Sequence, residues 1–86
     1  MKTGLEIAIR AKEQLAEVTG LKPDTVTGLK KDADGWHVTL EMIEMRRIPD
    51  TGDMLGSYSA LLDGEGNLMD YRRTRRYLRG ETMTEE

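Results

Sequence analysis

No cysteine and no phenylalanine occur in this chain of 86 residues, which contains a single histidine and two prolines. Without cysteine the chain cannot form a disulfide bond, a thiolate nucleophile or a cysteine-ligated metal centre. It has no apolar run long enough to span a membrane, and its N-terminus lacks the apolar core of a signal peptide. These absences predict a cytoplasmic protein that does not insert into membranes.

Charge is abundant but unevenly distributed. The formal net charge is −3, yet five arginines and no acidic residue lie between Arg72 and Arg79. The negative overall charge disfavours general affinity for nucleic acid, whereas the local cluster allows a specific basic surface.

The sequence offers little for catalysis. The histidine, His37, falls on the polar side of a predicted strand and has no second histidine or cysteine to complete a zinc site. No glycine-rich phosphate-binding motif is present. Glu41 and Glu44 are three residues apart in the same strand, which places them on opposite faces and prevents them from acting as a carboxylate pair. We therefore expect no enzyme activity, no cofactor and no metal.

Periodicity predicts a helix over residues 4–19. Apolar residues, among them Leu15 and Val18, recur on one side, and charged residues on the other. Thr3 and Glu6 have the spacing of a capping box, and Gly20 suits the position after the last helical turn.

Strands are predicted at residues 25–31, 36–45 and 55–62, with a return strand from 68 to at least Arg73. Turns at 32–35 and 63–67 and a loop at 46–53 separate them. Residues 36–45 alternate strictly at first, and Ile43 and Met45 then reverse the pattern, which indicates a β-bulge.

These elements predict an α+β fold, in which the N-terminal amphipathic helix packs on one face of a three- to four-stranded antiparallel meander sheet. We expect one domain over residues 1–80 and an acidic, flexible tail at 81–86. The opposite face of the sheet is open to water or to a partner. The predicted core residues are Leu15, Val18, Trp36, Val38, Leu40, Met42 and Tyr58.

Residues 70–81, "DYRRTRRYLRGE", admit three interpretations. The arginines could form cross-strand ion pairs, for which Glu41, Glu44 and Asp53 are the candidate acids. They could bind nucleic acid, with tyrosines stacking on bases. They could instead form a protein-docking surface, because arginine and tyrosine are enriched at binding hot spots. The candidate partner-binding residues are Arg46, Arg47, Tyr71, Arg72, Arg73, Arg75, Arg76, Tyr77 and Arg79.

The order of residues from Gly35 onward carries a more specific signal. A Gly-Trp pair opens a strand, two glutamates follow at a spacing of three, and an Arg-Ile-Pro loop leads to a tyrosine-bearing strand. The segment then closes on a glycine-centred turn and Tyr-x-Arg-x-x-Arg-Tyr-x-Arg. The residues concerned are Gly35, Trp36, Glu41, Glu44, Arg47, Ile48, Pro49, Asp53, Tyr58, Gly66, Leu68, Tyr71, Arg73, Arg76, Tyr77 and Arg79. This pattern, which covers about half of the chain, resembles the gas vesicle synthesis protein GvpO family.

The resemblance implies a cytoplasmic, gas vesicle-associated accessory protein that assists vesicle assembly without a cofactor or catalysis. Its partners are then other gas vesicle proteins, either the shell protein or further accessory proteins. An assembly factor needs an exposed surface that holds partners, so the resemblance favours protein docking by the arginine-rich strand. A small regulatory protein that binds nucleic acid through the same residues is the alternative.

Overall fold

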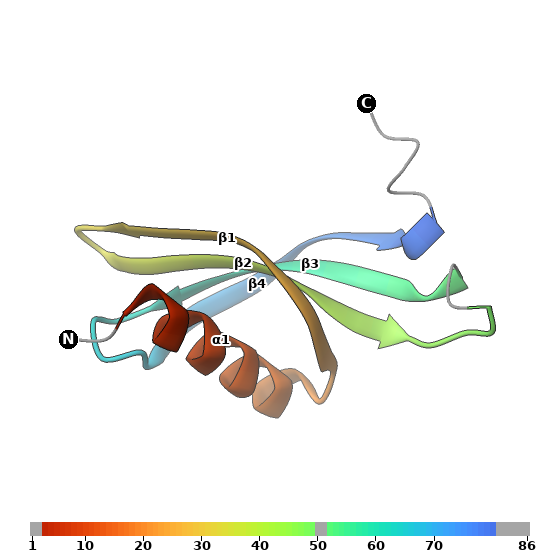
Figure 1. Ribbon diagram of the computed structural model, residues 1–86, viewed down its shortest axis with the longest axis horizontal. Helices are drawn as coiled ribbons and strands as arrows, with labels where there is room; N and C mark the ends of the chain where they lie inside the picture. Colours follow the sequence, from red (N-terminus) through yellow and green to blue (C-terminus); the bar gives the residue numbers. More distant parts are fainter. Residues whose placement is uncertain (1–2, 50–51, 81–86) are drawn as a thin grey trace.

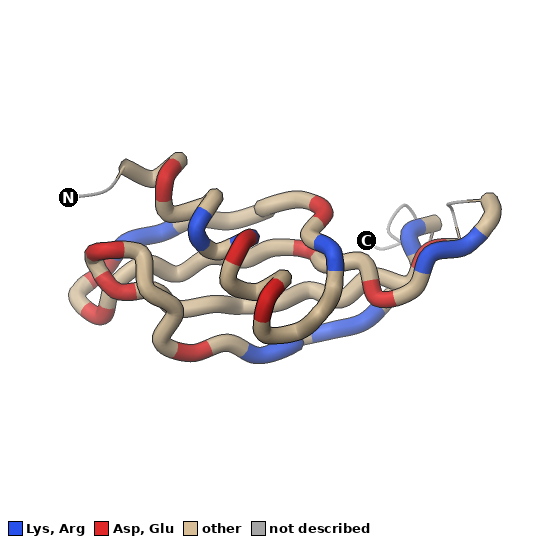
Figure 2. Tube along the Cα trace, turned by 90° about the horizontal axis from the view of Figure 1, so that it is seen from below, with Lys and Arg blue, Asp and Glu red and all other residues tan. Residues whose placement is uncertain are grey.

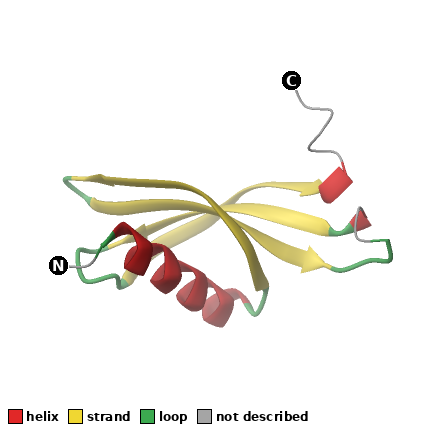
Figure 3. Ribbon diagram, in the orientation of Figure 1, coloured by secondary structure: helices red, strands yellow, loops and turns green. Residues whose placement is uncertain are grey.

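The computed structural model describes residues 3–49 and 52–80, in which one α-helix is followed by four strands. Figures 1 and 3 show how these elements are arranged. Their bounds are α1 Gly4–Thr19, β1 Lys22–Asp32, β2 Gly35–Met45, β3 Met54–Leu62 and β4 Leu68–Leu78. The strands form one antiparallel sheet in the order β1-β2-β3-β4, and α1 lies across one face of it. The predicted α+β meander is confirmed.

Both ends of α1 have the predicted caps. The Thr3 hydroxyl accepts the backbone N–H of Glu6, and the Glu6 carboxylate accepts the backbone N–H of Thr3. Gly20 ends the helix with φ 74°, a left-handed conformation that glycine adopts without steric cost. Local sequence is therefore sufficient to set the helix bounds.

The core forms between α1 and the sheet face beneath it, which we call the helix face. Ile7, Ala11 and Leu15, spaced one helical turn apart, are fully buried on α1. Their partners come from β2 and β3, and the complete cluster is Ile7, Ala11, Leu15, Val38, Leu40, Met42, Tyr58, Ala60 and Leu62, with Trp36 packed against it.

Cross-strand partners share a face of the sheet, so the register assigns every strand residue to the helix face or to the opposite, open face. Arg73 pairs with Tyr58 and Arg76 with Gly56, which places both arginines on the helix face. Arg72 pairs with Ser59 and Arg75 with Ser57, which places these two on the open face. The arginine cluster is thus divided between two surfaces.

Two of the register shifts in the sheet bear on this arrangement. The register of β2 against β3 shifts between Ile43 and Met45, where the reversed alternation predicted a bulge. A second shift, which the sequence did not indicate, leaves Thr74 as an extra residue in β4 opposite Ser57 and Tyr58. Without it Arg75 would share a face with Arg73.

The structure corrects several sequence-based expectations. Val18, predicted in the core, is 53% exposed, because the last turn of α1 lies away from the centre of the sheet (Figure 1). Strand β1 begins at Lys22 and ends at Asp32, beyond the predicted 25–31 at both ends, because pairing with β2 overrides Pro23 at an edge. The predicted tail at 81–86 lies outside the described residues.

The contrast between Leu15 and Val18 yields a stability prediction. Replacing Leu15 by alanine leaves a cavity between α1 and the sheet, so the free energy of unfolding should fall by about 2–4 kcal/mol. Val18→Ala, three residues later, should change it by less than about 0.5 kcal/mol, because the side chain is already half in water. Urea denaturation measures both, and equal losses would contradict this description of the core.

Candidate functional site

Glu44 is the acid that engages the arginines of the helix face. Its side chain is only 8% exposed and contacts Arg76 Nε at 2.9 Å and Arg73 Nη1 at 3.3 Å. The Tyr58 hydroxyl donates a further hydrogen bond to it at 3.1 Å. Burial first, and this bond to Glu44 second, raise the pKa of Tyr58 above its usual value. Arg73 and Arg76 are therefore committed to an internal acid.

Gly56 makes room for this network. A methyl group at position 56 would overlap Glu44 Oε2 and would lie 2.9 Å from Tyr58 Cε1. The absence of a side chain here lets the carboxylate lie flat over β3 between two strands.

Glu41 lies on the open face, opposite Ser57 of the neighbouring strand β3. Its carboxylate accepts hydrogen bonds from hydroxyl groups. Ser57 Oγ donates to its Oε1 at 2.8 Å, and the Tyr77 hydroxyl donates to the same oxygen. Burial first, and this bond to Glu41 second, raise the pKa of Tyr77 to about 12. Of the two glutamates offered as ion-pair candidates, Glu44 contacts arginines, whereas the partners of Glu41 among the described residues are hydroxyl groups.

Asp53 is buried directly before β3 and connects three segments. It accepts the backbone N–H of Arg47 at 2.7 Å and the Arg79 guanidinium at 3.2 Å, and Arg79 also contacts Asp24 at 3.6 Å. The N–H of Arg47, followed by the Arg79 guanidinium, holds the pKa of Asp53 below its ordinary value. Asp53 therefore fixes the start of the 46–53 loop against the end of β4.

Arg72 and Arg75 differ from these. Within residues 3–49 and 52–80 neither has a carboxylate within ion-pair distance, and both are exposed. The guanidinium carbon of Arg75 lies 4.6 Å from the centre of the Tyr77 ring, in a cation–π contact. Figure 2 shows the basic stretch along β4 at one border of the sheet.

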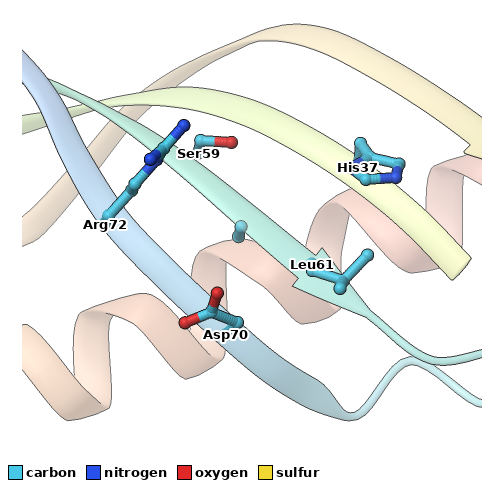
Figure 4. A pocket seen from close by; sticks show the side chains of 6 residues that line it. His37, Ser59, Leu61, Asp70 and Arg72 are labelled. Atoms are coloured by element: carbon cyan, nitrogen blue, oxygen red, sulfur yellow. The ribbon is translucent and has the colours of Figure 1, made fainter. Parts of the chain in front are cut away.

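Beside Arg72 the open face is hollowed into a shallow groove of about 190 Å³ (Figure 4). It is lined by His37, Ser59, Ala60, Leu61, Asp70 and Arg72. His37 Nε2 lies 2.9 Å from Asp32, the last residue of β1, and the ligand atoms of Asp32, Asp34 and His37 lie within 4.8 Å of one another, close enough to hold a metal ion. The serines of this face were missed as candidates, although Ser57 and Ser59 alternate with buried residues in "GSYSA", which signals a polar open face.

The remaining candidates are dispersed. Arg46 and Arg47 are exposed at the start of the loop after β2. Tyr71 is 39% exposed and pairs with Ala60, which places it on the helix face. The residues expected in the core and found in or against the cluster beneath α1 are Trp36, Val38, Leu40, Met42 and Tyr58.

In the described part of the chain, no helix is long and apolar enough to cross a bilayer.

The substitution Gly56→Ala tests the contacts of Glu44 with Tyr58, Arg73 and Arg76. The added methyl group displaces a carboxylate that three partners hold, so the free energy of unfolding should fall by about 1–3 kcal/mol. In a Glu44→Ala background the same substitution should cost clearly less, because the obstructing oxygen is gone. A double-mutant cycle in urea measures the coupling, and equal costs in both backgrounds would contradict the arrangement.

Asp53 should make stability depend on pH. Its pKa in the folded protein is below the ordinary value of 3.8, so its contribution is fully present above about pH 5 and is lost as the pH falls through the folded pKa. The difference in unfolding free energy between wild type and Asp53→Asn should therefore shrink between pH 7 and pH 3. Urea denaturation across this range measures the difference, and a constant gap would show that the charge of Asp53 contributes nothing.

Comparison with known proteins agrees with the pattern in the sequence. Gas vesicle protein O of a Streptomyces strain is 45% identical over 69 residues, which are 80% of this chain and 54% of that protein. Gas vesicle protein O of Haloferax mediterranei is 33% identical over 79 residues, 91% of this chain and 56% of that protein. Gas vesicle protein O1 of Halobacterium salinarum is 32% identical over 77 residues, 90% of this chain and 64% of that protein.

The chain thus spans little more than half the length of the first two relatives. No solved structure matches it. The sequence model of the family described as gas vesicle synthesis protein GvpO matches residues 2–83, which is nearly the whole chain. The chain belongs to the gas vesicle synthesis protein GvpO family.

Proposed function

We propose that this protein is an accessory factor in gas vesicle assembly, and that it binds other gas vesicle proteins through Arg72 and Arg75 on the open face of β4. Membership of the GvpO family supports a role in gas vesicle formation. The proposed role is binding, by the domain of residues 1–80 in the cytoplasm, without catalysis or a cofactor; the family is not a known enzyme family.

One observation carries the proposal, namely the division of the arginines. Arg73, Arg76 and Arg79 contact internal acids, whereas Arg72 and Arg75 face solvent with no carboxylate in ion-pair distance among the described residues. Surface ion pairs contribute only about 0–1 kcal/mol, so stability does not account for exposed arginines that lack even such a pair. A partner that supplies carboxylates does account for them.

The open-face arginines are also well placed for binding. They project from a strand of the sheet, and Arg75 is further held against the Tyr77 ring, whose hydroxyl is bonded to Glu41. A side chain that is ordered before binding loses less conformational entropy when a partner arrives.

Nucleic-acid binding is the alternative for the same residues, and the geometry of Tyr77 disfavours it. Arg75 covers one side of the ring and the hydroxyl is engaged, so stacking on a base would require these contacts to break. Tyr71 lies on the other face from Arg72 and Arg75. Titration with single-stranded oligonucleotide at low salt tests the alternative, for which about two phosphate contacts should give a shallow negative salt slope.

Arg72→Ala/Arg75→Ala should abolish or strongly reduce co-purification with other gas vesicle proteins from cells that make vesicles, because the two solvent-facing cations are removed. Arg73→Ala/Arg76→Ala is the matched control, since it removes the same charge from the same strand on the opposite face. It should keep co-purification but lower the melting temperature, because Glu44 loses both cations.

Circular dichroism establishes that each variant is folded. Should Arg73→Ala/Arg76→Ala fail to fold, Lys12→Ala/Lys31→Ala removes the same charge away from β4. A folded Arg72→Ala/Arg75→Ala protein that co-purifies with its partners and supports vesicle formation as wild type does would refute the assignment of this surface.

A further inference from the structure

Strand β4 is a border of the sheet, with β3 on one side and, in the described part of the chain, no strand on the other. Helix α1 packs mainly against β1, β2 and β3, and residues 71–76 of β4 are all exposed. A border strand of this kind presents alternate backbone N–H and C=O groups that lack a ladder partner, which makes it a template for an additional strand.

A second copy of the chain is a poor candidate for that additional strand. Antiparallel pairing of two β4 strands about Arg72 would set the two copies of Arg72 opposite each other, and pairing about Arg75 would do the same for the two copies of Arg75. Like charges directly opposite each other destabilise strand pairing. The arginines therefore act against self-association at this edge and favour an incoming strand of opposite charge.

The two faces of β4 favour different side chains in an added partner strand. On the open face Arg72 and Arg75 have no carboxylate within ion-pair distance in the described chain, so residues added beside them should be acidic. On the helix face Arg73 and Arg76 already form ion pairs with Glu44, and the neighbouring Tyr71 exposes apolar ring surface. Residues added on this side should be apolar. Because side chains of a strand alternate between faces, the required pattern is acidic and apolar in alternation.

We propose that the outer edge of β4 over residues 71–76 binds an extended segment of a partner protein with alternating acidic and apolar residues, which joins the sheet as a fifth strand. The acidic residues meet Arg72 and Arg75, and the apolar residues lie beside Tyr71. The bulge at Thr74 limits the continuous pairing to short stretches on either side of it. This inference rests on the proposed function and adds to it the mode of binding and the chemistry of the partner segment.

A synthetic heptapeptide, acetyl-Val-Glu-Val-Glu-Thr-Glu-Val-amide, serves as the probe with the full chain. The peptide should bind, and replacing its glutamates by glutamine should weaken binding. Arg72→Ala/Arg75→Ala should reduce the affinity about tenfold, and Arg73→Ala/Arg76→Ala by less than about threefold. Hydrogen exchange followed by NMR should show new protection of β4 backbone amides on binding.

A peptide N-methylated at alternate amides distinguishes strand addition from side-chain contact alone, because it cannot extend the ladder. Equal binding of this peptide, or binding without new amide protection, overturns strand addition. Absence of binding by the acidic peptide, or undiminished binding to Arg72→Ala/Arg75→Ala, overturns it as well, as does concentration-dependent dimerisation through β4.

The proposed function is judged separately by co-purification. One outcome is that the Arg72→Ala/Arg75→Ala variant loses its gas vesicle partners while the peptide shows no strand addition. In that case the assignment of the binding surface is supported and the inference of strand addition is refuted. If that variant keeps its partners, the surface itself is wrong, whatever the peptide does.

Discussion

The buried carboxylate of Glu44 organises the contacts between strands β3 and β4 on the helix face. A charge with so little exposure is stable only with partners, and Tyr58, Arg73 and Arg76 supply them from β3 and β4. Gly56 leaves the space in which they meet. Because Arg73 and Arg76 on the helix face are paired with Glu44, the β4 arginines without an ion pair among the described residues lie on the open face.

The same sheet thus serves two purposes. Its helix face closes the core beneath α1 and contains the Glu44 network, whereas its open face carries serines, a shallow groove and the two arginines that lack an internal acid. Asp53 accepts the backbone N–H of Arg47 and contacts the Arg79 guanidinium. These two contacts hold the loop after β2 against the end of β4. The contacts that stabilise the sheet and the arginines without an ion pair among the described residues thus lie on different faces.

Much of the fold was predictable because its signals are local. The capping box and Gly20 bound α1, strict alternation identified β2, and the reversal at Ile43 and Met45 located a bulge. Val18 was misplaced because helical periodicity gives the direction of a side chain and not how far the sheet extends beneath it. Strand β1 was predicted too short because Pro23 is compatible with an edge strand, which local propensity alone does not reveal.

Composition and spacing alone determined that the chain is cysteine-free, that it has one helix before a meander, and that its arginines cluster near the end. The residue order also identified the family. Only the tertiary structure decided which arginines form ion pairs with internal acids, because ion pairing depends on cross-strand register. The bulge that leaves Thr74 unpaired turns Arg75 to the face opposite Arg73, and no period in the sequence marks that position. The hydroxyl partners of Glu41 were hidden for the same reason, since they come from separate strands that only the folded sheet brings together.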